Sequence, residues 1–206
     1  MGTTLYSTAY CPYGWSARIV LYEKGVPFDT FEVDLKNQQP EFLAVSPGAR
    51  VPVFVDGTTN IVDALVINEY IEDTYPEPNL LGGTPAERAE VRSTVIEHDW
   101  IRSQPLARVM LMLLHHPELR EEEGMHRHLR SWYRYLDRLD RHFASNAWRV
   151  LERYTLADVS IYTTVAISRG FGMPVGERPA LSAWMKRMSR RDPVRRAAPD
   201  RLPAPA

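Results

Sequence analysis

The chain has 206 residues, 44% of them hydrophobic, and 25 lysines and arginines against 26 aspartates and glutamates. This balance gives no charge excess of the kind that marks a nucleic-acid or membrane-surface protein. The single cysteine excludes an intrachain disulfide. No apolar run approaches the roughly 18–20 residues of a membrane span, and the N-terminus lacks the pattern of a signal peptide. We therefore expect a cytoplasmic globular protein with no membrane or nucleic-acid partner.

The first 75 residues alternate between strand and helix patterns. Strands are indicated by β-branched and aromatic residues or by alternating polarity, and helices by apolar spacing and capping residues such as Gly25. Asp56-Gly57 is a strong hairpin signal. The expected elements are strand 3–10, helix 12–24, strand 28–35, helix 39–45, strands 51–56 and 58–63, and helix 64–75.

The composition changes after residue 75. Residues 76–85, PEPNLLGGTP, are too rich in Pro and Gly to continue a helix and predict a linker. Beyond them only helix patterns occur, over 86–116 (with a kink expected at Pro105), 124–145, 155–170 and 179–192, followed by a loose tail over 193–206. We expect an α/β domain over 1–77, a linker over 78–85 and an all-helical domain over 86–206.

The lone thiol lies where the first strand gives way to the first helix, in Cys11-Pro12-Tyr13-Gly14. Unpaired N–H groups and the helix dipole at such a junction stabilise a thiolate and lower its pKa. Pro12 suits the first helical position. Because Gly14 stands where a dithiol motif has its second cysteine, only monothiol chemistry remains, such as a mixed disulfide with an external thiol. A buried, inert cysteine is the alternative.

Four segments carry a resemblance, over nearly the whole chain, to the cytosolic glutathione S-transferase superfamily. They are the Cys11 motif, SPGARVPVF (46–54), Asp63-Ala64-Leu65 and YTLADVSI (154–161). The resemblance implies a thioredoxin-like N-terminal domain followed by a helical C-terminal domain. Cys11 lies where omega-class members keep a catalytic cysteine. The Trp15-x-x-Arg18-Ile19 spacing is similar to that of the zeta class, which has serine at the position of Cys11.

The same resemblance assigns a thiol-binding site. Val51, before a cis Pro52, would pair its backbone with the cysteine of glutathione, and Lys36 would approach the glycyl end. Asp63 would receive the γ-glutamyl ammonium, and the N–H of Ala64 the γ-glutamyl carboxylate. The family usually has Glu or Gln and then Ser at these two positions, and a lost charge-assisted bond costs on the order of 1–3 kcal/mol.

Simpler roles stand beside these assignments. Asp63 suits a plain helix N-cap, Lys36 a solvated surface lysine, and Pro52 an edge-strand proline. Because Asp63 and Ala64 depart from the family pattern, the resemblance implies glutathione or another low-molecular-weight thiol as the cosubstrate. No metal is expected, because His126 and His128 would point about 200° apart on a helix.

Thr155 and Asp158 have capping-box spacing, with Asp in place of Glu or Gln. The resemblance places this box at the start of the buried helix of the second domain. Its role there is in folding and not in catalysis.

The resemblance implies a homodimeric enzyme acting on a small-molecule electrophile. Its reaction would be nucleophilic addition, thiol–disulfide exchange with Cys11 or a thiol-assisted isomerisation. The expected acceptor pocket is lined by Tyr10, Tyr13, Trp100 and Tyr162.

Two alternatives are not enzymes. IEHDW (96–100) resembles stringent starvation protein A, a member of the superfamily that binds RNA polymerase and is not a transferase. Its surface motif Pro-His-Pro corresponds here to Pro76-Glu77-Pro78, which lacks the imidazole. A non-catalytic ligand binder is the other alternative.

Overall fold

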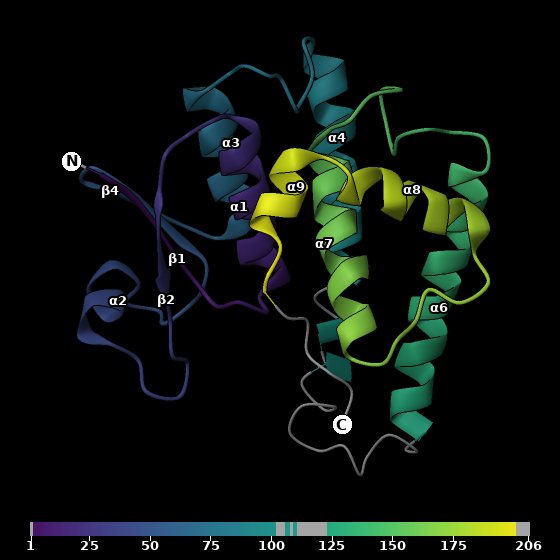
Figure 1. The fold of residues 1–206 in the computed structure, drawn as a ribbon, viewed down its shortest axis with the longest axis horizontal. Helices are drawn as coiled ribbons and strands as arrows, with labels where there is room; N and C mark the ends of the chain where they lie inside the picture. Colours follow the sequence, from purple (N-terminus) through teal and green to yellow (C-terminus); the bar gives the residue numbers. More distant parts are fainter. Residues whose placement is uncertain (1, 102–105, 108, 111–122, 201–206) are drawn as a thin grey trace. The chain divides into compact units, whose positions relative to one another are not determined.

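The structure, a computed structural model, describes residues 2–101, 106–107, 109–110 and 123–200. The described residues form two compact units (Figure 1). The N-terminal unit comprises residues 2–80 together with 190–200, and the helical unit comprises 81–189. The kink expected at Pro105 lies outside the described residues.

The N-terminal unit is built on a four-stranded mixed sheet with strand order β2-β1-β3-β4. β1 runs parallel to β2 and antiparallel to β3, and β3 pairs antiparallel with β4. The hairpin predicted at Asp56-Gly57 is confirmed, with Gly57 at φ +60° in its turn. The strands are β1 (Thr3–Ser7), β2 (Asp29–Glu32), β3 (Val53–Asp56) and β4 (Thr59–Val62).

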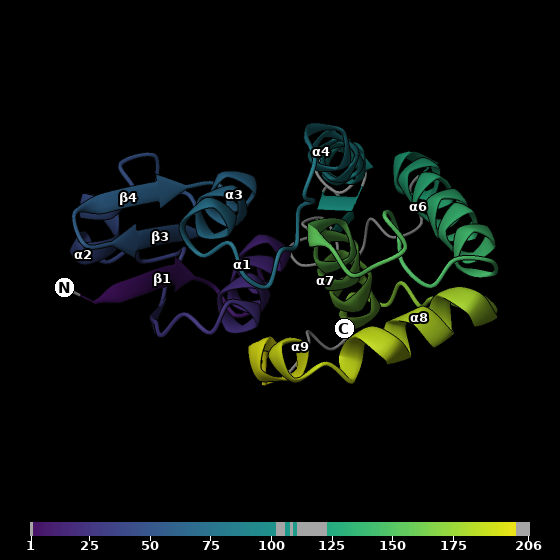
Figure 2. The same ribbon diagram turned by 90° about the horizontal axis from the view of Figure 1, so that it is seen from above.

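Helices cover both faces of this sheet (Figure 2). α1 (Pro12–Glu23) and α3 (Ala64–Thr74) pack against each other and against the strands on one face. On the other face, α2 (Pro40–Val45) inserts Phe42, which is fully buried against Val33 and Val53. The predicted thioredoxin-like architecture is thereby confirmed.

A last short helix, α9 (Asp192–Ala197), also belongs to the N-terminal unit and packs on α1. Val194 and Ala197, one turn apart, are 1% and 2% exposed, so this helix has its own apolar face. The loose tail predicted from residue 193 onward is therefore wrong as far as Ala197.

The helical unit contains no strand among its described elements. A single bridge pairs Val150 with Arg153. None of the helices in the described part of the chain is long and apolar enough to cross a bilayer. The helices are α4 (Pro85–Ile101), α6 (Glu123–Phe143), α7 (Leu156–Gly170) and α8 (Pro179–Ser189).

The predicted capping box at the start of α7 is confirmed. Thr155 Oγ1 accepts from the N–H of Ala157 (3.3 Å), and Asp158 Oδ2 accepts from the N–H of Thr155 (3.0 Å). Asp158 also accepts from the N–H of Arg149 (3.0 Å) and from the indole of Trp184 (3.2 Å). Burial raises the pKa of Asp158 to about 6, although these donors favour the carboxylate. The box is a folding feature, because its carboxylate is enclosed by its own helix start and its neighbours.

Candidate functional site

The register of the sheet gathers four loops at one end. Ser7 pairs with Glu32, Tyr6 pairs with Val53, and Val53 pairs with Val62. Because β1 and β2 are parallel while β3 runs the other way, the segments after Ser7, after Glu32, before Val53 and after Val62 all leave the sheet at the same end. These are the segments that hold Cys11, Lys36, Val51-Pro52 and Asp63-Ala64, together with Tyr10 and Tyr13.

Cys11 is the N-cap residue of α1. Its backbone is extended (φ −79°, ψ 112°), and its Sγ accepts a hydrogen bond from the N–H of Gly14 at 3.4 Å. Pro12 occupies the first turn, where its missing N–H leaves no bond unmade. The residue is partly exposed. A sulfur in this position accepts from the unpaired N–H groups of the helix start, which favours its anionic form.

The turn before Cys11 is fixed by two contacts. The carbonyl of Thr8 accepts from the N–H of Cys11 (3.2 Å), and Glu32 Oε1 accepts from the N–H of Ala9 (2.8 Å). β1 therefore ends at Ser7, earlier than the predicted strand end at Tyr10.

Packing against β1 favours glycine at position 14. A Cβ placed on Gly14 would lie 1.7 Å from Ser7 Oγ and 2.8 Å from Ser7 Cβ. Ser7 is fully buried in β1, so it has little room to give way. The close approach of α1 to β1 thus disfavours any side chain at this position, that of a second cysteine included. No local sequence pattern marks this contact.

The Val51-Pro52 peptide bond is cis, as predicted. The loop before it is held by Ser46, a residue that the sequence reasoning missed. Its hydroxyl donates to the carbonyl of Arg50 (3.0 Å) and accepts from the N–H of Arg50 (3.1 Å). Ser46 is 1% exposed, so this small clamp fixes the backbone directly before Val51.

Asp63 caps its own helix. Its Oδ1 accepts from the N–H of Leu65 at 2.8 Å, as the plain N-cap interpretation requires. Its φ of +80° is unusual for a residue other than glycine, and such backbone strain of about 1–3 kcal/mol is concentrated at ligand sites. Ala64 is 2% exposed. The capping bond and the strained backbone thus coexist at this helix start.

The remaining candidate residues are spread over both units. Lys36 is exposed, and its backbone N–H donates to Asp34 Oδ1 (2.9 Å). Tyr10 is 45% exposed in the N-terminal unit. In the helical unit Trp100 is 73% exposed, whereas Tyr162 is buried with its ring 6.4 Å from that of Trp184.

Burial raises the pKa of the Tyr162 hydroxyl. The acceptor pocket expected from Tyr10, Tyr13, Trp100 and Tyr162 stays a prediction. Among the residues that the structure describes, no three His, Cys, Asp or Glu side chains gather as a metal ion would require.

Comparison with known proteins identifies both halves of the chain. Residues 5–79 match the family model of the glutathione S-transferase N-terminal domain, and residues 104–192 match that of the C-terminal domain. Glutathione S-transferase 1 of Dianthus caryophyllus is 30% identical over 189 residues, which are 87% of this chain and 83% of the relative.

Two bacterial relatives carry other names. FtsZ-localized protein A of Caulobacter vibrioides is 29% identical over 98% of this chain and 94% of its own. A stringent starvation protein A homolog of Haemophilus ducreyi is 26% identical over 92% of this chain and 86% of its own.

Two solved structures share the fold of this chain. FzlA from C. crescentus superposes with a TM-score of 0.85 at 26% identity, covering 100% of this chain and 96% of that one. A glutathione transferase family member from Pseudomonas fluorescens pf-5, solved with two glutathione molecules bound, has a TM-score of 0.83 at 23% identity, covering 95% and 92%. With a thioredoxin-like sheet, a helical second unit and matches across both, the chain belongs to the glutathione S-transferase family.

Proposed function

We propose that this protein is a glutathione-type thiol transferase that uses Cys11 as its nucleophile. The observation that carries the proposal is the position of the thiol. Cys11 caps α1, accepts from the N–H of Gly14 and remains partly exposed. A thiolate at a helix start is stabilised by the N–H groups around it, and exposure lets an external thiol or disulfide reach it.

Thiol–disulfide exchange is the reaction that fits one cysteine best. The Cys11 thiolate attacks the glutathionyl sulfur of a mixed disulfide between glutathione and a small thiol. A new S–S bond forms to Cys11, and the small thiol leaves as a thiolate that takes up a proton. A second glutathione thiolate then attacks the glutathionyl sulfur and releases Cys11 and glutathione disulfide. Because Cys11 is the single cysteine of the chain, no resolving cysteine within it competes with that second glutathione.

The thiol cosubstrate would bind at the end of the sheet where the four loops gather. The backbone of Val51, before Pro52, would pair with the cysteinyl part of glutathione, and Lys36 would meet its glycyl carboxylate. Asp63 and the N–H of Ala64 would hold the γ-glutamyl group. Since Asp63 already caps α3 and Ala64 has no hydroxyl, we expect weak binding of glutathione, or selection of another low-molecular-weight thiol.

The second substrate would be a small electrophile or disulfide in a pocket that includes Tyr10, Tyr13, Trp100 and Tyr162. We further propose a homodimer, the arrangement implied by the resemblance to this family. Light scattering at micromolar concentration checks the assembly, and a monomeric mass would contradict it.

Intact-protein mass spectrometry tests the nucleophile. The protein is incubated with glutathione disulfide, and its mass is measured before and after dithiothreitol. We expect the gain of one glutathionyl group that the reductant removes, and no gain in Cys11→Ser. A wild-type protein that stays unmodified at millimolar glutathione disulfide would contradict the proposal.

A protein-binding role is the second candidate, and it is favoured by the names of two relatives over nearly the whole chain. A polymerase-binding regulator of the stringent starvation type is one form of it. Purified RNA polymerase and FtsZ polymers are each tested for co-sedimentation with the wild-type protein and with Cys11→Ser. Binding that is indifferent to Cys11, in a protein without exchange activity, would favour this second role over the enzyme.

A further inference from the structure

The C-terminal helix is fastened to α1 by three kinds of contact. Arg191 makes two hydrogen bonds to the Glu23 carboxylate, both of 2.9 Å. The Arg18 Nε–H donates to the carbonyl of Ala197 at 3.2 Å. Val194 and Ala197 form a buried apolar face. α9 therefore presents its other side chains from a fixed position on α1.

The turn that joins α1 to β2 is fixed as well. The N–H of Val26 donates to the carbonyl of Leu21 at 3.0 Å, and the Thr3 hydroxyl on β1 donates to the carbonyl of Pro27. Val26 is 5% exposed. Phe28, which ends this turn, is thus carried by a backbone that is tied to α1 and to the sheet.

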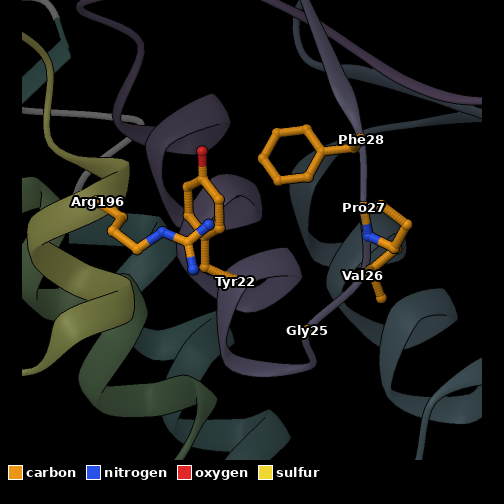
Figure 3. A pocket seen from close by; sticks show the side chains of 6 residues that line it. All are labelled: Tyr22, Gly25, Val26, Pro27, Phe28 and Arg196. Atoms are coloured by element: carbon orange, nitrogen blue, oxygen red, sulfur yellow. The ribbon is translucent and has the colours of Figure 1, made fainter.

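An open pocket of ≈ 410 Å³ lies between these two segments of the N-terminal unit (Figure 3). The Arg196 guanidinium of α9 lies over the Tyr22 ring, 4.3 Å from its centroid, and the centroid of the Tyr22 ring lies 5.0 Å from that of Phe28. Val26 and Pro27 also line the pocket. Its volume falls within the roughly 300–1,000 Å³ of small-molecule sites.

The pocket carries one positive charge that no negative group balances. Arg195, one position earlier on α9, pairs with Asp192 of the same helix. Arg196, by contrast, has no hydrogen bond or ion pair to any residue that the structure describes. None of the described residues that line the pocket is acidic. An anion can therefore accept from the Arg196 guanidinium without displacing a protein acceptor.

We propose that this pocket binds a small aromatic carboxylate. The carboxylate accepts from Arg196, because the planar fork of a guanidinium matches its two oxygens. The aromatic body lies against Pro27 and Phe28, where the rings of the wall favour another ring over an aliphatic chain. A single cation in a largely apolar wall suits a monoanion of this kind.

The proposed site is separate from the thiol site. Phe28 directly precedes β2, so the pocket lies where β2 begins. The loop that holds Cys11 leaves the sheet where β2 ends, beside the pair of Ser7 and Glu32. The ligand therefore does not compete with a thiol at Cys11, and its binding is independent of the proposed transferase activity.

NMR spectroscopy of the full-length ¹⁵N-labelled protein, titrated with phenylacetate, tests the proposal. We expect saturable shifts of the amides of Gly25, Val26 and Phe28. Phenylacetamide lacks the charge and acetate lacks the ring, so neither should produce comparable shifts. Arg196→Gln should weaken phenylacetate binding about tenfold, and Arg196→Lys should weaken it less, because the charge remains without the fork.

Two further variants serve as a control and a second test. Arg195→Gln removes the same charge from the neighbouring position and should leave the affinity unchanged. Phe28→Leu keeps an apolar side chain but removes the ring, and should weaken phenylacetate binding in a protein that circular dichroism shows to be folded.

Three results would overturn the inference: no saturable shift at millimolar phenylacetate, equal affinity in the wild-type protein and Arg196→Gln, or shifts confined to the residues around Cys11. Equal shifts with inorganic phosphate would overturn the preference for an aromatic carboxylate. The same titration of Cys11→Ser should match that of the wild-type protein, so loss of the proposed enzyme activity would leave this inference standing.

Discussion

Replacing Gly14 by alanine tests the packing contact between α1 and β1 at this position. The new Cβ would lie 1.7 Å from Ser7 Oγ and 2.8 Å from Ser7 Cβ. Rotation of the hydroxyl could relieve the first clash. The second involves a Cβ carried by the backbone of β1, so α1 and β1 would have to separate locally.

The expected cost follows from these distances. Overpacking of a buried site costs about 1–3 kcal/mol, and replacing glycine in a helix returns up to about 1 kcal/mol. Both contacts are far shorter than van der Waals distance, so the upper end of that cost, about 3 kcal/mol, applies. Less the return of about 1 kcal/mol, the net loss is about 2 kcal/mol, which lowers the melting temperature of a protein of this size by roughly 4–8 °C. Thermal unfolding followed by circular dichroism measures it.

Two further variants make the result interpretable. Gly124→Ala in α6 places a Cβ with no described atom within 4 Å, and should keep or slightly raise stability. Ser7→Gly combined with Gly14→Ala removes both clashing atoms and should lose less than the sum of its single changes. If Gly14→Ala were as stable as Gly124→Ala, the argument that packing favours glycine at position 14 would be wrong.

Three other predictions address the folding features and the thiol site. Since burial raises the pKa of Asp158 from 3.8 to about 6, its contribution to stability is full at low pH and is lost as pH rises through about 6. Between the two pKa values, 3.8 and about 6, the free energy of unfolding of the wild-type protein, measured by urea titration, should fall by about 3 kcal/mol as pH rises. That of Asp158→Asn should not show this fall. Lys24 Nζ and Glu72 Oε2 lie 2.6 Å apart with side chains 0% and 1% exposed, so Glu72→Gln should cost about 3 kcal/mol. A Lys24→Met, Glu72→Leu pair should recover only part of it, because the N–H of Leu80 loses its bond to Glu72 Oε1 (2.9 Å). Ala64→Ser should tighten glutathione binding about tenfold in calorimetry, and an equal or weaker affinity would mean that the γ-glutamyl carboxylate does not lie at the start of α3.

The features that the sequence predicted depend on neighbours along the chain. The hairpin at Asp56-Gly57, the capping box of Thr155 and Asp158, and the order of strands and helices all have short-range causes. The resemblance to the glutathione S-transferase superfamily predicted the cis bond before Pro52 and the two-unit architecture. The predicted ends of the strands were less accurate. β2 ends at Glu32 and does not reach residue 35, because the Asp34 side chain accepts from the N–H of Lys36 and forms a turn there.

The features that the sequence did not predict depend on residues brought together by folding. The contact of Gly14 with Ser7 exists only once α1 lies on β1. The bond from Arg18 to Ala197 joins residues 179 positions apart, and no local pattern marks either partner. Asp63 was foreseen both as a cap and as a ligand, but its positive φ is imposed by the hairpin-to-helix junction.

The exchange activity of Cys11→Ser tests the central proposal most directly. The assay follows glutathione disulfide released from a mixed disulfide of glutathione and 2-mercaptoethanol, with circular dichroism to show that the variant is folded. A hydroxyl is close in size to a thiol but is a far weaker nucleophile at neutral pH. The account predicts activity in the wild-type protein and, in Cys11→Ser, a rate equal to that without enzyme. A folded Cys11→Ser protein with wild-type activity would contradict it.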